Sequence, residues 1–468
     1  MSGGLNFEYG FNTNISQPKD NNMPMRIYFL GDFTGARSAK ENTTTHSIVA
    51  INIDNFDEIM IKLSPSLELP SGEELAFHEL EDFHPDNLFE HAIFNNLRRL
   101  KQELSNPSTA ERATQEILSS YQLKESFQTQ NNTFENKNDM FERLLGQQHT
   151  SPDTSTPQVT ANSKSNTADK LNQFLTTLLK PHIIKDIKPE HENVLIFINT
   201  AIEELMRSII HSSEFQALES AWRSTRDVIF NTNYDESCQL FYLVNTSKKE
   251  LHNAVSGNNS FVTKISQHIQ NIDSTYYDVL IGNYQFSDTN DDINTLNYLA
   301  SLAETLQCQF IGAATDSLIN ADADSLWHQF RQTPQAKCTA LSYPRILLRL
   351  PYGKKQDEIN TFVFEEFRQS YQHEQLLWGN SAFVCAQILI NQYHSDENIY
   401  LKTETHITDL PAFIYIEDNE KKLHPCSEFL LSEQQLIHIN KQGIMVFASY
   451  RNKNSIRLFS DEIHAVNT

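Results

Sequence analysis

Cysteine is scarce in this sequence, and its spacing argues against a disulfide framework. The 468 residues include five cysteines, which lie far apart and form no CxxC pair: Cys238, Cys308, Cys338, Cys385 and Cys426. An odd number of widely spaced cysteines is typical of reduced, mostly buried thiols in a cytosolic protein. We therefore expect no disulfides to hold this fold together.

Long apolar runs are also missing. No stretch approaches the ~18 apolar residues that a membrane-spanning helix needs. The N-terminal sequence MSGGLNFEYG has neither the basic start nor the apolar core of a secretory signal. These absences predict a soluble, cytoplasmic protein without a membrane partner.

Basic residues are too few for a general nucleic-acid-binding protein. Lysine and arginine total 37 against 60 acidic residues, so the net charge is −23. A nucleic acid would be repelled, and we predict no such partner. The length suits about three domains. An apolar fraction of 39% is adequate for packed cores, while a mean hydropathy of −0.48 implies polar loops or linkers.

The signatures of catalysis are absent as well. The segment GDFTGARS follows a strand-like run, as a phosphate-binding loop would, but no lysine follows Gly31 and Gly35 to reach the phosphates. GxSxG and GxGxxG do not occur, and no cysteine lies in a recognisable protease context. We predict no catalytic residues, no cofactor and no enzymatic activity.

Two segments superficially resemble metal sites. His78, His84 and His91 lie among carboxylates, but no HExxH or i, i+4 histidine pair places two ligands on one helix face. Residues 288–294 begin like a calcium loop, yet position twelve is Leu299 instead of glutamate. We predict no metal ligands in this chain.

The apolar patterns predict a mixed α/β protein. Short apolar strands are expected at 26–30 and 47–53, followed by a helix. Farther along, strands and helices alternate in the order strand, helix, strand, helix, strand at 238–244, 261–270, 277–284, 291–307 and 308–314. This alternation predicts a partly parallel sheet. The short apolar pieces after residue 401 predict a smaller mixed α/β element.

Residues 105–168 differ in composition from the rest of the chain. They are rich in Ser, Thr, Asn and Gln and poor in large apolar residues, which predicts a flexible polar linker. One apolar island, 139–146, interrupts it with residues at amphipathic-helix spacing: Met140, Phe141, Leu144 and Leu145. Such an island either binds a partner or docks as a short helix on its own domain.

The motif PRILLRLPYG (344–353) contains two arginines in an otherwise apolar run. We expect Arg345 and Arg349 to form structural ion pairs with the neighbouring carboxylates Glu365 and Glu366. Binding of an external anion is the alternative.

Two sets of motifs resemble the two subunits of one machine. Resemblance to the small subunit of the type VI secretion contractile sheath is carried by RIYFLGDFTG (26–35), INIDNFDEIMIKL (51–63) and FHELEDFHPDNL (77–88). Resemblance to the large sheath subunit is carried by FQALESAW (215–222), LVNTSKKEL (243–251), LIGNYQF (280–286), PRILLRLPYG, FVFEEF (362–367) and LLWGNSAF (376–383). The motifs follow the family's order, so the chain resembles a natural fusion of both subunits.

The resemblance implies a small-subunit-like α+β domain tethered to a large-subunit-like α/β domain. The expected boundaries are 1–104 for the first domain, 105–168 for the linker, 169–400 for the second core and 401–468 for a C-terminal segment that is short relative to the family. In the first domain, the resemblance makes three positions packing residues: Leu80, Phe83 and Leu88.

The resemblance also implies a function and partners. Sheath proteins polymerise around an inner tube, assemble on a baseplate and contract, and a disassembly ATPase recycles them. Leu5, Phe7 and Tyr9 alternate with polar residues in 5–11, which predicts a strand. By resemblance, this strand is donated to a sheet of a neighbouring molecule or of its own large-subunit block, while the island 139–146 is the ATPase-binding helix.

Two other functions stay open at this stage. Because the large-subunit part is short at its C-terminus, the chain is alternatively a sheath-like accessory, a cap or a non-polymerising paralogue. A nucleotide-binding regulator is the second alternative.

Overall fold

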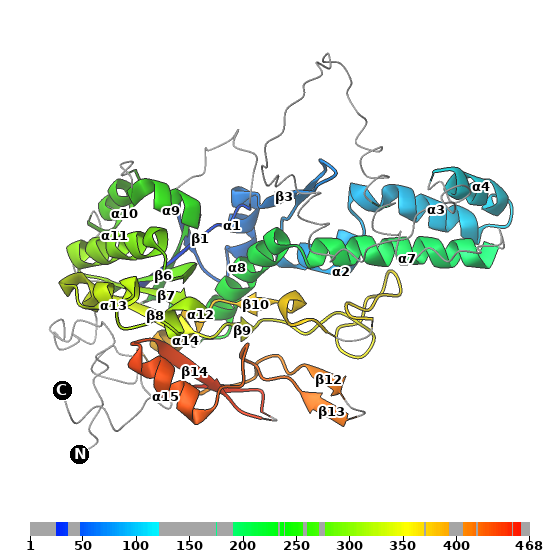
Figure 1. Ribbon diagram of the computed structural model, residues 1–468. Coiled ribbons are helices and arrows are strands. Elements are labelled where there is room, and N and C mark those ends of the chain that lie inside the picture. Colours follow the sequence, from blue (N-terminus) through cyan, green and yellow to red (C-terminus); the bar gives the residue numbers. More distant parts are fainter. Residues whose placement is uncertain are drawn as a thin grey trace, which may run out of the picture.

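The computed structural model is shown in Figure 1. It describes residues 25–35, 47–120, 175, 191–232, 235–237, 239–255, 260–270, 277–368, 371–392, 406–417, 420–451 and 453–459. We call the described part of 25–120 the N-terminal block and that of 191–459 the C-terminal block. The expected donor strand 5–11 and the apolar island 139–146 lie outside the described residues.

A nine-stranded sheet forms the centre of the molecule (Figure 1). Its order is β11-β15-β14-β8-β7-β6-β1-β5-β2. The strands are β1 (Met25–Gly31), β2 (Ile48–Ile51), β5 (Gln239–Asn245), β6 (Tyr277–Phe286), β7 (Gln309–Ala314), β8 (Thr339–Tyr343), β11 (His406–Ile407), β14 (Met445–Ser449) and β15 (Ile456–Phe459). From β5 to β14 neighbouring strands run parallel, whereas β2, β15 and β11 pair antiparallel. The predicted mixed α/β class with a partly parallel sheet is confirmed.

The N-terminal block contributes an interior strand to this sheet. β1 lies between β5 and β6 and pairs with both in parallel. Every residue of β1 is buried, because helices cover both faces of the sheet. Ile27 and Phe29 belong to the core on one face, and Tyr28 and Leu30 belong to the core on the other. The two blocks therefore share one sheet and two continuous cores.

Helices lie on both faces of the sheet. The face of Tyr28 and Leu30 packs against α9 (Lys248–Val255), α10 (Ser260–Gln270), α11 (Asn290–Leu306), α13 (Leu326–Arg331) and α15 (Glu433–Lys441). The face of Ile27 and Phe29 packs against α1 (Phe56–Leu63), α8 (Ser213–Phe230) and α14 (Ala382–Gln392). Two short elements that follow β7 and precede β8 are α12 (Asp316–Ile319) and η5 (Pro334–Cys338).

A three-helix arm extends from one side of the sheet (Figure 1). In it α3 (Asn95–Ser105) and α4 (Ala110–Ser120) pack against the long helix α7 (His191–Ile210). The linker expected from residue 105 therefore begins too early, since α4 occupies 110–120. Ala113 and Ile117 recur at helical spacing and are fully buried, so this stretch has an apolar face despite its polar composition.

Short elements complete the N-terminal block. They are β3 (Ser66–Glu68), β4 (Glu74–Ala76), η2 (Leu80–Phe83), α2 (Pro85–Leu88) and η3 (Ala92–Phe94). β3 and β4 form an antiparallel hairpin. Leu80, Phe83 and Leu88 are all buried, as expected for packing residues.

The sequence predicted a separate, smaller α/β element after residue 401. This prediction is wrong. β14 pairs with β8, so this segment extends the main sheet. What projects from the body is the antiparallel hairpin of β12 (Ile414–Glu417) and β13 (Glu420–Leu423). Three remaining short elements are β9 (Ile346–Leu347), η6 (His373–Gln375) and β10 (Trp378–Gly379).

Candidate functional site: the junction between the two blocks

A buried ion pair joins β1 to β6 inside the sheet. The Arg26 guanidinium donates from Nε to Asp278 Oδ1 at 2.6 Å and from Nη2 to Oδ2 at 2.7 Å. The two residues are direct register partners. Burial disfavours the charged guanidinium, but the hydrogen bonds and the charge of Asp278 outweigh it and raise the pKa of Arg26. Burial also raises the pKa of Asp278, and the hydrogen bonds and charge of Arg26 oppose that rise.

The turn after β1 is built by its own aspartate. Asp32 Oδ1 accepts hydrogen bonds from the backbone N–H groups of Thr34 at 3.1 Å and Gly35 at 2.9 Å. Gly35 has a φ of +81°, and a Cβ there would collide with the backbone oxygen of Ser66. The glycine thus serves a tight turn, and no phosphate-binding role is needed to explain the GDFTG segment.

The same turn is held by side chains of the C-terminal block. Trp222 Nε1 donates to the Phe33 carbonyl at 3.1 Å, and the two rings meet edge to face with centroids 5.5 Å apart. From β5, Asn245 Oδ1 accepts the Phe33 N–H at 2.9 Å. The turn after β1 and helix α8 therefore form one contact, although their motifs resemble different sheath subunits.

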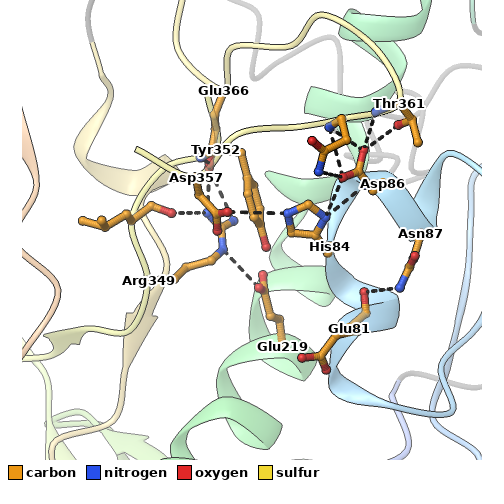
Figure 2. Close-up of polar contacts among 12 residues, drawn as sticks. Glu81, His84, Asp86, Asn87, Glu219, Arg349, Tyr352, Asp357, Thr361 and Glu366 are labelled. Atoms are coloured by element: carbon orange, nitrogen blue, oxygen red, sulfur yellow. Dashed lines mark hydrogen bonds and ion pairs between the residues drawn. The ribbon is translucent and has the colours of Figure 1, made fainter. Parts of the chain in front are cut away.

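A second contact is polar and centres on Asp86, at the start of α2 (Figure 2). Its carboxylate accepts the backbone N–H groups of Asn360 at 3.0 Å and Thr361 at 2.9 Å, and the Thr361 hydroxyl at 2.6 Å. Partial burial opposes ionisation, but the hydrogen bonds from Thr361 and Asn360 outweigh it and lower the pKa of Asp86. Asp86 thus clamps the C-terminal block to α2.

His84 lies beside this clamp and touches both blocks. Its Nδ1 accepts the backbone N–H of Asp86 at 3.2 Å and so caps α2. Its ring meets the Tyr352 ring edge to face with centroids 5.0 Å apart, and its Nε2 lies 3.7 Å from Asp357 Oδ1 (Figure 2). The histidine is thus a structural contact between two loops.

Beside the clamp lies a buried charge network (Figure 2). Arg349 Nε donates to Glu219 Oε1 at 3.0 Å, and Nη1 donates to Glu366 Oε2 at 2.8 Å. The same Glu366 oxygen accepts the Tyr352 N–H at 2.8 Å. Burial alone would raise the pKa of Glu366, but the charge of Arg349 and the bonds from His211 and Arg349 lower it to about 2.

A segment that we call the strap, residues 360–368, connects these contacts to the arm. Its Glu365 carbonyl accepts both Nε and Nη2 of Arg207 on α7, at 3.0 and 2.7 Å. Its Arg368 pairs with Glu203 on the same helix at 3.0 Å. Phe362 packs on Phe89 with ring centroids 4.7 Å apart. The strap thus ties α2, the arm and the buried network together.

The predicted ion pairs are half correct. Arg349 pairs with Glu366 as expected, but Arg345 pairs with Glu428, 83 residues away, and not with the Glu365–Glu366 pair. The sequence analysis did not predict the ion pair of Glu219, although this residue lies in the motif FQALESAW. Arg26 and Asp278 were also missed, and their signal was present in the sequence as one charged residue in each of two apolar strands.

Three further observations concern expectations from the sequence. Among the described residues, no group of three or more His, Cys, Asp or Glu side chains is arranged to hold a metal ion. Within the same ranges, no helix combines the length and the apolar character needed to cross a bilayer. The interface residues named from the sequence all lie outside the described residues: Leu5, Phe7, Tyr9, Met140, Phe141, Leu144 and Leu145.

Comparison with known proteins gives matches on both sides of this junction. The family model described as "EvpB/VC_A0108, tail sheath N-terminal domain" matches residues 192–326 and 323–464, more than half of the chain. A second model, "Type VI secretion system, VipA, VC_A0107 or Hcp2", matches residues 5–132. The chain belongs to the type VI secretion sheath family. It joins the VipA and VipB sheath families in one polypeptide.

A curated relative agrees with this membership. The sheath chain is 25% identical over 309 residues to the type VI secretion system sheath protein TssC1 of Pseudomonas aeruginosa. The alignment covers 59% of this chain, and the chain spans 61% of the length of that relative. The junction described above is thus the place where the VipA-matching and VipB-matching parts of the sheath chain meet.

Proposed function

We propose that this chain is a structural subunit of a type VI secretion contractile sheath, in which one polypeptide supplies what two sheath families supply separately. The observation that carries the proposal is the position of β1. A VipA-matching strand lies inside the VipB-matching sheet. It pairs with a strand on each side, and the Arg26–Asp278 ion pair links it to β6. One chain therefore supplies both parts of a sheet whose two faces carry continuous cores.

The proposed subunit polymerises around an inner tube in the cytoplasm and contracts. Its partners are further copies of itself or other sheath subunits, the inner tube protein, the baseplate and a disassembly ATPase. Its role is structural and not enzymatic. The charged groups at the junction support this, because each named one is engaged with another residue of the chain: Arg26, Asp86, Arg349 and Glu366.

Self-assembly is tested with the full chain expressed without any other sheath protein. We expect negative-stain images to show rings or tubes with a regular repeat, and sedimentation to show large particles. A chain that stays monomeric, even after purified inner tube is added, contradicts the proposal and favours an accessory or cap.

We further propose that residues 5–11 act as the donated strand. Main-chain hydrogen bonds would supply the affinity, and Leu5, Phe7 and Tyr9 on one side of the strand would supply the register. Changing these three residues to serine should weaken self-association and leave the unfolding midpoint unchanged. The matched control changes Asn6 and Glu8, which a strand over 5–11 would place on its other side, to serine. Equal sedimentation of both variants would refute strand donation.

The apolar island is the proposed binding helix for the disassembly ATPase. A full chain with Met140, Phe141, Leu144 and Leu145 changed to serine should assemble normally and lose binding to that ATPase. Retained binding at unchanged affinity would rule out this assignment.

A further inference from the structure

The position between β5 and β6, which we call the β1 slot, must be filled by a strand from far away in the sequence. Arg26 and Asp278 are separated by 252 positions along the chain. β5 and β6 contact β1 and not each other, so an empty slot would leave two rows of unpaired backbone groups inside the sheet. Filling the slot correctly is therefore a condition for folding.

The apolar pattern of β1 specifies its faces but not its register. Alternation assigns Ile27 and Phe29 to one core and Tyr28 and Leu30 to the other. A shift by two residues would keep each side chain on its own face, and most neighbours in both flanking strands would still be large and apolar. The hydrophobic contacts alone thus discriminate weakly between registers.

The charged pair removes this ambiguity. In the observed register Arg26 lies opposite Asp278 of β6, whereas a forward shift by two residues would place it opposite Leu280 and Tyr242. No other acidic residue occurs among the paired residues of β5 and β6 that flank β1. Arg26 is 1% exposed and Asp278 is 6% exposed, so a shifted register would leave a buried guanidinium without its carboxylate and a buried carboxyl group without its hydrogen-bond donor.

We propose that Arg26 and Asp278 form the specificity-determining pair of the β1 slot: the slot accepts a strand that places a guanidinium opposite Asp278, and each chain fills its own slot. Filling from the same chain follows from tethering, because a linked strand is present at a high effective concentration. A separate small sheath subunit without a cation at this position is therefore excluded. The inference concerns folding and strand choice, so it does not depend on polymerisation.

Charge exchange in the full-length chain tests both parts. Arg26→Asp and Asp278→Arg alone should each lower the yield of soluble protein several-fold or more, because each places like charges together in the core. The double variant restores the opposite charges within one chain and should recover soluble protein. Co-expression of the two single variants with different tags should not recover it.

Each outcome of this experiment bears on the proposal. Recovery on co-expression, with both tags in one complex, would mean that β1 enters the slot of another copy and would overturn filling from the same chain. Native yields of both single variants would overturn the role of the pair. If the double variant fails to fold, the apolar replacement described next decides the role of the pair, and recovery on co-expression would still overturn filling from the same chain.

The apolar replacement Arg26→Met with Asp278→Leu separates specificity from stability. Buried ion pairs can often be replaced by apolar residues with little loss of stability, so this variant should fold. We expect hydrogen exchange of the β1 amides to become faster or heterogeneous while amides of β7 and β8 keep their protection. A single native protection pattern in β1 would show that the pair is dispensable for register and would overturn the proposal.

Discussion

The two contacts that join the N-terminal and C-terminal blocks differ in how completely they exclude water. In the sheet, the side chains of Arg26 and Asp278 are 2% and 7% exposed. At the polar contact centred on Asp86, which we call the rim contact, the side chains of His84 and Asp86 are 24% and 18% exposed, and that of Asp357 is 49% exposed. The sheet contact is thus a core, whereas the rim contact resembles an interface between separate parts.

This difference has energetic consequences. A charge in the sheet has no access to water, so its partner decides whether the strand can be inserted at all. A charge at the rim retains partial hydration, so its loss weakens a clamp without emptying the core. The expected loss of stability for the buried Arg349 network lies between these two cases. Its side chains are as buried as the pair in the sheet, but they connect loops and a helix and not two strands. The predictions below follow this order.

The largest effect is expected inside the sheet. Phe29 is fully buried, stacks on Phe383 with ring centroids 5.5 Å apart and packs against Phe241. Phe29→Ala should lower the free energy of unfolding by about 3–5 kcal/mol, because it leaves a cavity between the blocks. Urea denaturation measures this loss. Ile61→Ala, at a residue 54% exposed on α1, is the control and should change little.

The second effect is a loss of stability in acid. The pKa of Glu366 is lowered from 4.5 to about 2 in the folded chain, so the folded state favours the ionised form. Its contribution is therefore fully present above about pH 4.5 and is lost as the pH falls toward 2. The loss is on the order of 3 kcal/mol. Unfolding measured between pH 6 and 2 tests this, and the Glu366→Gln variant should have a flatter profile over the same window.

The sequence was sufficient for most of the elements because their signals are local. The alternation of patterns predicted the helices α10 and α11, and short apolar runs predicted β6 and β7. The position of β1 between β5 and β6 could not be predicted in this way. An apolar strand can occupy any interior position, and the choice depends on partners hundreds of residues away.

The same limit explains which ion pairs were found. Glu366 lies 17 positions from Arg349 and was within reach of a local argument. Glu219 and Glu428 lie 130 and 83 positions from their arginines, so only the fold brings them together. The expected linker failed for a related reason, since composition averages hid the short apolar face of α4.

A smaller effect is expected when the buried network loses one charge at neutral pH. Glu366→Gln keeps the shape of the side chain but weakens its bonds to Arg349 and to the Tyr352 N–H. We expect a loss of about 1.5–3 kcal/mol, because Glu219 still compensates the guanidinium. Glu365→Gln, at the exposed neighbour in the same strap, is the matched control. Equal losses for both variants would mean that the buried network contributes no more to the free energy of unfolding than an exposed carboxylate does.

The smallest effect is expected at the rim, where Asp86 holds Asn360 and Thr361. Asp86→Asn keeps one acceptor oxygen but loses the charge that strengthens these bonds, so unfolding should become easier by about 1 kcal/mol. The loss should be local as well as small. Hydrogen exchange of the strap amides at 360 and 361 should accelerate while β1 amides keep their protection. Asp324→Asn, at an exposed position away from the junction, should do neither. If Asp86→Asn exposed β1 to exchange as well, the rim and the sheet would be one cooperative unit, and the distinction between the two contacts would fail.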